Sequence, residues 1–303
     1  MKIQLSEINE LVKHHPQECV CGSDEAYLEK IKAAADSILR GTARIILLAG
    51  PSSSGKTTTA GMLRKYLQEN GRDALIISMD DFYKDKSDPS YPRDEEGRLD
   101  FEATEALRID EIKRCLQKVL AGEDFFVPKY IFGEGRSVRD AERITLHQNS
   151  FLIMEGLHAL NPIFTEGLAK ESVTKIYISV SSDIYDGDKL MLSGRMIRFI
   201  RRMTRDSIYR ATDVFSTLQR WGSVTQGEDR NLYPYKDTAD IKLNTFHLYE
   251  LGLLKPLAKN AINASSKELF GEYIKEIISA LEKVEPLDRA LLSENSLLKE
   301  FVP

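Results

Sequence analysis

The segment Gly50–Thr57 narrows the choice of fold more than any other part of the chain, because Gly-Pro-Ser-Ser-Ser-Gly-Lys-Thr fits the pattern G-x-x-x-x-G-K-[ST]. A loop of this spacing wraps its backbone N–H groups around phosphates, and its glycines allow backbone angles that other residues resist. The pattern requires a strand before the loop and a helix after it. Residues 45–49 are an apolar run, and residues 57–69 have a helical pattern that ends at Asn70-Gly71. The sequence therefore predicts a phosphate-binding loop between a buried strand and a helix.

The side chains of this loop have separate expected roles. The Lys56 ammonium can bridge the β- and γ-phosphates, and the Thr57 hydroxyl can join the Mg²⁺ shell. The helix that begins near Lys56 directs its dipole and its free N–H groups at the phosphates. ATP or GTP, together with Mg²⁺, is therefore the expected cofactor. The residues expected to hold the donor are Gly50, Ser52, Ser53, Ser54, Gly55, Lys56, Thr57 and Thr58.

Apolar runs of strand length recur along the chain and alternate with helical patterns. After residues 45–49, such runs cover 74–79, 151–154 and 175–180, and a shorter one covers 239–244. Strands that are apolar throughout are typical of parallel sheets, which are buried on both faces. The order strand, loop, helix, strand predicts an α/β fold of the P-loop NTPase type: a doubly wound parallel sheet with helices on both faces.

The remaining segments are predicted from helical spacing and from turn residues. Polar stretches that contain glycine are predicted as loops at 84–100 and 128–143. Further helices are predicted over 26–39, 109–120 and 267–283, with a long basic helical stretch over 190–220.

The chain has 303 residues, enough for one large α/β domain with additions. We expect a helical N-terminal extension (1–40), a P-loop domain (41–285) with a helical lid near 190–220, and a C-terminal tail (286–303). Nothing in the sequence indicates an internal repeat or a flexible linker between these parts.

Two of the predicted strands end in acidic residues. Asp80 and Asp81 follow the run 74–79, and Glu155 follows the run 151–154. In a doubly wound sheet, ligands bind beyond the carboxyl ends of the strands. A carboxylate there can ligate Mg²⁺ or accept a proton from an attacking hydroxyl, although Asp80 or Asp81 could also cap the next helix. Two such ends on the sheet of the phosphate loop favour a catalytic role.

Arginines are concentrated between residues 195 and 210. Arg198, Arg201, Arg202 and Arg205 share one helical face, and guanidinium groups match phosphate oxygens. A solvated face or a nucleic-acid stripe is the alternative, but the formal net charge of −5 disfavours nucleic acid as a partner. In a chain with a phosphate loop, this pattern favours a lid that closes over the phosphates.

The cysteines and the apolar runs bear on location. There are three cysteines and no secretory signal, which indicates a reducing compartment. No apolar run approaches the roughly 20 residues that cross a bilayer. We therefore expect a cytoplasmic protein without membrane contact.

The early histidines and cysteines do not predict a zinc site, because their spacing matches no standard zinc pattern. These residues are His14, His15, Cys19 and Cys21.

With its motifs taken in order, the chain resembles the uridine kinase / phosphoribulokinase family of P-loop kinases, and most of all bacterial uridine kinase-like nucleoside kinases. The resemblance runs from about Ile45 to Lys255. The phosphate loop alone is generic, but the ordered set is specific. Its members after the loop are Asp80-Asp81-Phe82-Tyr83, Leu99-Asp100-Phe101, residues 127–130, 154–160, 198–206, 217–228, 233–235 and 249–251.

The resemblance implies roles for the residues that match. Asp80 matches the base for the 5′-hydroxyl, Asp100 matches an aspartate that holds ribose hydroxyls, and Glu155 matches a glutamate linked to Mg²⁺. The aromatic matches would pack around the nucleobase, and the arginines would close over the phosphates. The acceptor-site candidates are Asp80, Tyr83, Asp100, Tyr130, Phe132 and Arg136.

Two departures from the family pattern affect these expectations. Residues 133–137 lack the histidine that often reads the pyrimidine edge, and Arg210-Ala211-Thr212 stands where the lid often has R-G-R. The first concerns base specificity, and the second concerns lid closure.

We therefore predict a nucleoside kinase that transfers the γ-phosphate of ATP or GTP to the 5′-hydroxyl of uridine or cytidine. Two alternatives remain: a kinase of another hydroxyl metabolite, such as a sugar phosphate or a pantothenate-like compound, and a non-catalytic nucleotide-binding switch. The sequence is also compatible with a homo-oligomer. The expected catalytic residues are Asp80, Lys56, Arg198 and Arg202. Arg201 and Arg205 would help to hold the donor, and Thr57, Glu155 and Asp81 would hold Mg²⁺.

Overall fold

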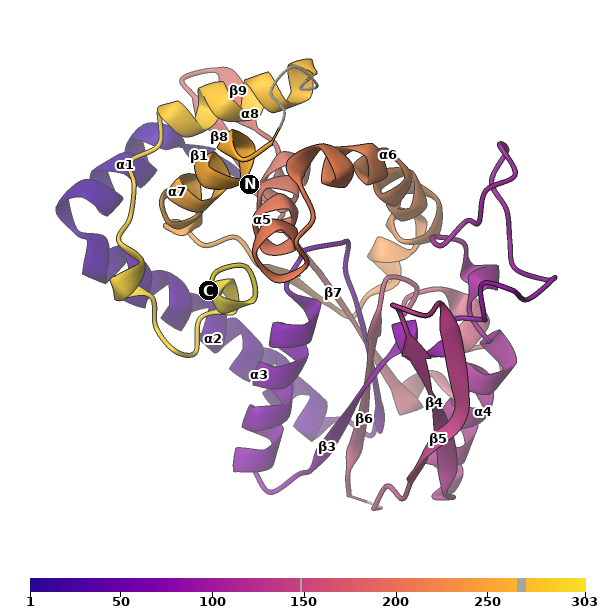
Figure 1. Ribbon diagram of the computed structural model, residues 1–303. Helices are drawn as coiled ribbons and strands as arrows, with labels where there is room; N and C mark the ends of the chain where they lie inside the picture. Colours follow the sequence, from indigo (N-terminus) through magenta and orange to yellow (C-terminus); the bar gives the residue numbers. More distant parts are fainter. Residues whose placement is uncertain (148, 266–270) are drawn as a thin grey trace.

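A parallel sheet forms the centre of the computed structural model, which describes residues 1–147, 149–265 and 271–303 (Figure 1). Its five strands run in the order β10-β7-β2-β6-β3, and neighbours pair in parallel. The strands are β2 (Ile45–Ala49), β3 (Ala74–Ser78), β6 (Phe151–Gly156), β7 (Val173–Ser179) and β10 (Ile241–Asn244). The predicted apolar runs are therefore strands of one sheet.

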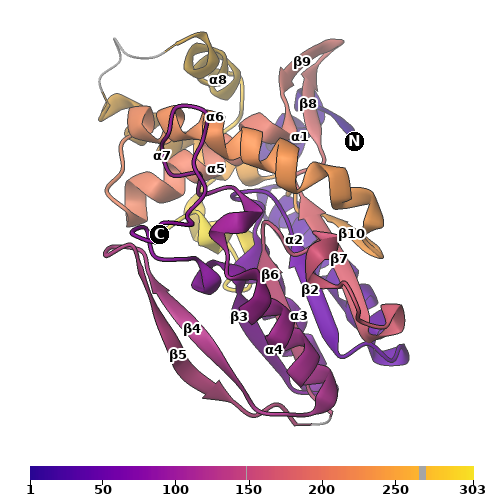
Figure 2. The ribbon, with the colours of Figure 1, turned by 90° about the vertical axis from the view of Figure 1, so that its right-hand side faces the viewer.

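Helices cover both faces of this sheet (Figure 2). Alternate side chains of β2 point to opposite faces, so that Ile46 and Leu48 join one hydrophobic core while Ile45 and Leu47 join the other. This is an α/β fold of the P-loop NTPase type, as predicted. The helices are α1 (Leu5–His14), α2 (Pro16–Arg40), α3 (Lys56–Glu69), α4 (Ile109–Ala121), α5 (Gly194–Tyr209), α6 (Val214–Asn231), α7 (Glu250–Asn263) and α8 (Glu272–Glu282).

Three of the predicted helices coincide well with observed ones. The patterns at 57–69 and 109–120 correspond to α3 and α4, and the pattern at 26–39 lies within the longer α2. For the helix predicted over 267–283, α8 begins only at Glu272, and residues 267–270 lie outside the described residues.

The prediction that a long basic helical stretch covers 190–220 is wrong at its start and at residues 210–213. Strand β9 (Lys189–Leu192) comes first, and Ser193 then caps α5 by accepting a hydrogen bond from Met196 N. The helix breaks after Tyr209, where Ala211 has a left-handed backbone (φ 49°). Asp213 caps the new helix α6. Arg210 follows the last residue of α5, so the other five arginines between residues 195 and 210 all lie on α5.

The prediction of a loop over 128–143 is also wrong. Strands β4 (Phe125–Ile131) and β5 (Arg136–Ile144) form an antiparallel hairpin beside the main sheet, with Gly135 in a left-handed conformation at the turn (φ 67°). Most side chains of β5 are exposed, so the strand has no apolar alternation that could reveal it. Residues 84–100 form turns, as expected.

A second, smaller sheet was not predicted. Strand β1 (Lys2–Gln4) pairs in parallel with β8 (Asp183–Asp186), which pairs with β9. The N-terminal segment is thereby joined to the chain between the main sheet and α5. Within the three described ranges, no helix combines the length and the apolar character needed to cross a membrane.

Candidate active site

A cavity of about 960 Å³ opens beyond the carboxyl ends of β2, β6 and β3, which are neighbours in the sheet. The phosphate loop follows β2, Asp80 follows β3, and Glu155 lies at the end of β6 opposite Ser78. Parallel pairing therefore brings the loop and both acids to one edge, as predicted. The cavity is lined by Ser52, Ser53, Ser54, Gly55, Lys56, Thr57, Asp80, Tyr83, Lys86, Phe101, Glu102, Tyr130, Phe132, Gly133, Glu155, Leu157, Arg202, Arg205, Arg210, Arg220, Val224, Glu228 and Glu300.

The phosphate loop has the backbone of an anion cradle. Ser53 and Gly55 adopt left-handed conformations (φ 57° and 89°), which turn successive N–H groups inward. A side chain at Gly50 could not be accommodated, because its Cβ would lie 2.6 Å from Ile178 O. Lys56 Nζ, at the start of α3, donates to Gly50 O at 3.0 Å and to Pro51 O at 3.3 Å.

The donor groups of this loop fit the phosphates of a nucleotide. Among the described residues, the buried hydroxyls of Ser53 and Ser54 have no hydrogen-bond partner. Lys56 contacts only backbone carbonyls of its own loop and forms no ion pair in the described part of the chain. A cradle with an ammonium, free hydroxyls and a helix N-terminus fits a di- or triphosphate. Gly50 and Thr58 lie outside the cavity lining, whereas the loop residues between them line it, apart from Pro51.

Two carboxylates face this cradle. Asp80 lies open to the cavity but is surrounded by protein, and this burial raises the pKa of its carboxyl, while the Lys56 ammonium opposes the rise. Glu155 is only 7% exposed, and burial raises its pKa in the same way, again opposed by Lys56. Both acids therefore bind protons more readily than an acid in water does.

The structure places Asp81 away from the cavity. Its carboxylate pairs with Lys129 at 3.0 Å and accepts a weak hydrogen bond from Tyr130 N at 3.4 Å. Asp81 thus joins the end of β3 to the β4–β5 hairpin, which is a different use from the expected Mg²⁺ ligation. No group of three or more His, Cys, Asp and Glu side chains in the described ranges forms a metal site of its own. Mg²⁺ commonly takes one or two carboxylates and completes its shell with phosphates and water, and Thr57 and Glu155 fit that pattern.

The structure brings Glu102 to the cavity in place of Asp100. Asp100 pairs with Arg230 at 3.0 Å and accepts a hydrogen bond from Glu102 N, so it is occupied outside the cavity. The Glu102 side chain packs on Gly227 of α6, where an added Cβ would lie 2.3 Å from Glu102 Cβ. Burial raises the pKa of Glu102 to about 7, although Arg202 opposes the rise. Sequence reasoning missed this residue because loop side chains follow no periodicity that separates neighbouring acids.

The four arginines of α5 divide into two pairs. Arg202 and Arg205 line the cavity, and Arg202 donates to Ser52 Oγ at 2.8 Å. Arg198 and Arg201 are 1% and 0% exposed and do not line it. Helical spacing placed all four on one broad face, but that face spans both the cavity wall and the protein interior.

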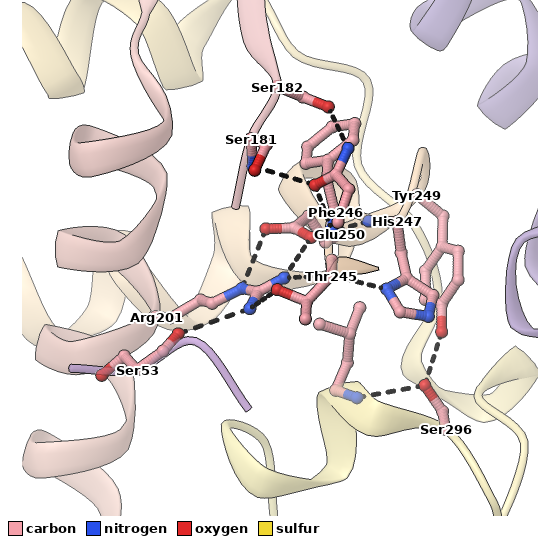
Figure 3. Close-up of polar contacts among 12 residues, drawn as sticks. Ser53, Ser181, Ser182, Arg201, Thr245, Phe246, His247, Tyr249, Glu250 and Ser296 are labelled. Carbon is pink, nitrogen blue, oxygen red and sulfur yellow. Dashed lines mark hydrogen bonds and ion pairs between the residues drawn. The ribbon is translucent and has the colours of Figure 1, made fainter. Parts of the chain in front are cut away.

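Arg198 and Arg201 instead hold the back of the phosphate loop. Arg198 makes two hydrogen bonds of 2.7 Å to Glu228 and donates to Ser52 O at 2.9 Å. Arg201 forms a similar fork with Glu250 and donates to Ser53 O at 3.3 Å, as Figure 3 shows. Glu228 also accepts from Ser52 N at 2.9 Å. Buried charges of this kind require such partners.

Aromatic side chains form the other end of the cavity. The rings of Tyr83 and Tyr130 lie 5.6 Å apart, and those of Tyr130 and Phe132 lie 4.9 Å apart. Phe101 lines the same region, and Lys86 lies 5.5 Å from its ring. Arg136, expected at the acceptor, is instead exposed and paired with Glu134 at 2.5 Å.

Comparisons with known proteins agree on one family. The family model described as "Phosphoribulokinase / Uridine kinase family" matches residues 45–249. A uridine kinase of Schizosaccharomyces pombe is 30% identical over 188 residues, which cover 62% of this chain and 37% of that protein. A uridine kinase of Lactobacillus helveticus is 27% identical over 198 residues, covering 65% of this chain and 84% of that protein. The chain thus matches little more than a third of the yeast protein.

A solved structure shows the same fold. A crystal structure from a Silicibacter species, provisionally named a fructose transport system kinase, superposes with a TM-score of 0.51 at 17% identity. The match covers 70% of this chain and 98% of that one.

Proposed function

The chain belongs to the phosphoribulokinase / uridine kinase family, and from this premise we propose that it transfers the γ-phosphate of a nucleoside triphosphate to the 5′-hydroxyl of a nucleoside, uridine or cytidine being the expected acceptors. One observation carries the proposal: a single cavity holds the phosphate loop, the strand-end carboxylates Asp80 and Glu155, and an aromatic end. A nucleotide-binding switch needs a phosphate loop but no such acceptor end. The geometry supports a transferase in preference to a switch.

In the proposed mechanism, Asp80 handles the acceptor proton. It lies in the same cavity as Lys56, and its raised pKa makes it a stronger base than a solvated carboxylate. Asp80 therefore orients the acceptor hydroxyl and takes its proton as the oxygen attacks phosphorus. We assign the metal to Glu155 instead, because it is more buried and lies at the neighbouring strand end.

The phosphates are held by Lys56, the loop amides and the arginines that face the cavity. When bound, Mg²⁺ with the triphosphate supplies the transferable group and neutralises charge on it. Arg202 and Arg205 stabilise negative charge at the transferring group and help to exclude water. Arg198 and Arg201 act indirectly, by fixing the carbonyls of Ser52 and Ser53.

Glu102 is the group that we expect to hold the ribose hydroxyls. It lines the same cavity as the phosphate loop and the aromatic side chains, and its carboxylate can accept two hydrogen bonds. Tyr83, Tyr130 and Phe132 offer flat apolar surfaces for a base. Stacking surfaces alone discriminate weakly between bases. We therefore expect a broad base preference and a requirement for ribose.

An acceptor carrying its own anionic group is the second candidate. Lys86 and Arg220 line the cavity, and neither forms an ion pair within the described part of the chain. Either could bind a phosphate or a carboxylate of the acceptor.

A panel of acceptors tests the proposal. Ribonucleosides, deoxynucleosides, ribulose 5-phosphate and pantothenate are compared by kcat/KM in an assay of ADP formation. Highest values for uridine or cytidine support the proposal, and a preference for an anionic compound replaces it with the second candidate. ADP formation that no acceptor stimulates contradicts both and favours the switch.

A further inference from the structure

The C-terminal segment, residues 296–302, packs directly against the phosphate loop. Leu297, Leu298 and Phe301 have no exposed surface, and the Leu297 side chain fills the space beside Gly55, where an added Cβ would lie 2.8 Å from it. The segment lies beside α3 near the centre of the molecule, where the C-terminus is marked in Figure 1. It lies beyond the residues that the family model matches, so the family resemblance does not explain it.

Hydrogen bonds fix the position of this segment. Ser296 Oγ lies 2.6 Å from the hydroxyl of Tyr249, as Figure 3 shows. It also accepts a hydrogen bond from Leu298 N at 3.1 Å. At the other end, Tyr209 Oη donates to Val302 O at 2.6 Å. The segment is thus attached to the residue before α7, Tyr249, and to the last residue of α5, Tyr209.

Glu300 turns from this segment into the active-site cavity. Its carboxylate accepts a hydrogen bond of 2.9 Å from Thr58 Oγ1 and lies 4.0 Å from Arg205. It also lines the cavity. A negative charge from the C-terminal segment is thereby held against the first turn of α3 and beside an arginine that the mechanism uses.

This position lies on the expected path of the donor phosphates. Thr59 N donates to Gly55 O, so the free amides of the first turn of α3 end at Thr58. The amides of a loop of this type cradle the α- and β-phosphates, while its lysine reaches the β- and γ-phosphates. With the γ-phosphate directed toward Lys56 and Asp80, the α-phosphate falls toward Thr58. The Glu300 carboxylate and an α-phosphate are both anions that would share the Thr58 hydroxyl, and Glu300 also lies beside Arg205, which the proposed mechanism assigns to the phosphates.

We propose that Glu300 is an internal competitor of the donor nucleotide, which must move this carboxylate before its phosphates occupy the cradle. This inference rests on the proposed use of a nucleoside triphosphate. Displacement would free Thr58 and Arg205 for the phosphates and loosen the segment 296–302. The affinity for the donor is then set in part by residues far from the phosphate loop in sequence.

The test is ADP binding by isothermal calorimetry to the wild-type 303-residue chain and to Glu300→Gln. The amide keeps an oxygen for the Thr58 hydroxyl but carries no charge, so phosphates displace it more easily. We expect Kd for ADP to be about tenfold lower in Glu300→Gln than in the wild-type protein. This factor corresponds to a wild-type carboxylate that is docked in about nine tenths of the molecules and leaves about a tenth competent to bind. Glu294→Gln is the matched control, because it removes the same charge from an exposed position in the same tail.

Hydrogen exchange supplies a second readout that does not depend on activity. Saturating ADP should speed exchange of the amides of residues 296–302 in the wild-type protein. An unchanged or higher Kd in Glu300→Gln, or slower exchange with ADP, overturns the inference, because Glu300 is then a structural contact or a donor ligand. Equal binding to both proteins counts against this inference alone. ADP that binds neither protein counts against the proposed function as well.

Discussion

Removing the Arg198 side chain should lower the stability of the fold. The sequence predicted a catalytic arginine at this position, but the structure pairs it with a buried glutamate. The side chains of Arg198 and Glu228 are 2% and 0% exposed, and they are joined by two hydrogen bonds of 2.7 Å. Arg198→Ala leaves the Glu228 carboxylate buried without its partner. Breaking a buried pair in this way costs about 3–5 kcal/mol, a large part of the stability of most domains.

The comparison with Arg202 isolates this effect. Arg202 is 14% exposed, and its partner Asp206 is also paired with Arg205. Arg202→Ala should therefore leave the free energy of unfolding within about 1 kcal/mol of the wild-type value. It should lower kcat instead, because Arg202 faces the cavity.

Urea unfolding followed by circular dichroism measures both variants. The double variant Arg198→Met with Glu228→Leu is an informative control, because replacing a buried ion pair by apolar residues is often neutral. It should recover most of the lost stability but bind ADP more weakly than the wild-type protein, since Ser52 loses hydrogen bonds at both its carbonyl and its amide. An Arg198→Ala protein with wild-type stability and reduced kcat would refute this account of Arg198.

Two further variants probe the cavity itself. Lys56→Ala should lower kcat about 10²–10³-fold without changing the melting temperature, because the ammonium contacts only carbonyls of its own loop; a large loss of stability would contradict this. Burial raises the pKa of Glu102 to about 7, so kcat/KM for the acceptor should fall as pH drops below about 7. Glu102→Gln should remove this step and leave the loss of activity that comes from protonating Asp80. Because the pKa of Glu102 is raised on folding, its contribution to stability declines as pH rises from its ordinary value, 4.5, to about 7. Glu102→Gln should therefore raise the melting temperature at pH 8 but not at pH 4, and equal shifts at both would contradict the assignment.

The parts of this site that the sequence predicted are those with a local signature. The phosphate loop is contiguous, and its backbone conformation depends on its own glycines. Asp80 and Glu155 follow buried strands, and parallel pairing alone brings strand ends together. Loop, sheet and acids were therefore accessible without a structure.

The parts that were missed depend on the direction of single side chains or on distant contacts. Asp81 follows Asp80 and Asp100 precedes Phe101, and both of these neighbours line the cavity. The two aspartates themselves pair outside the cavity, Asp81 with Lys129 and Asp100 with Arg230. The exposed strand β5 carries no apolar pattern. Glu300 meets Thr58 across 242 positions of the chain, and no local pattern encodes such a contact. The domain boundaries, the oligomeric state and the cytoplasmic location stay predictions.

The measurement that tests phosphoryl transfer most directly is ADP formation with and without uridine, by the wild-type protein and by Asp80→Asn. The wild-type protein should form ADP much faster when uridine is present. Asp80→Asn should lose this stimulation about 10²–10⁴-fold while its Kd for ADP stays at the wild-type value, because only the proton acceptor is removed. Uridine-stimulated ADP formation that survives in Asp80→Asn, or ADP formation that uridine does not stimulate in the wild-type protein, would contradict the account.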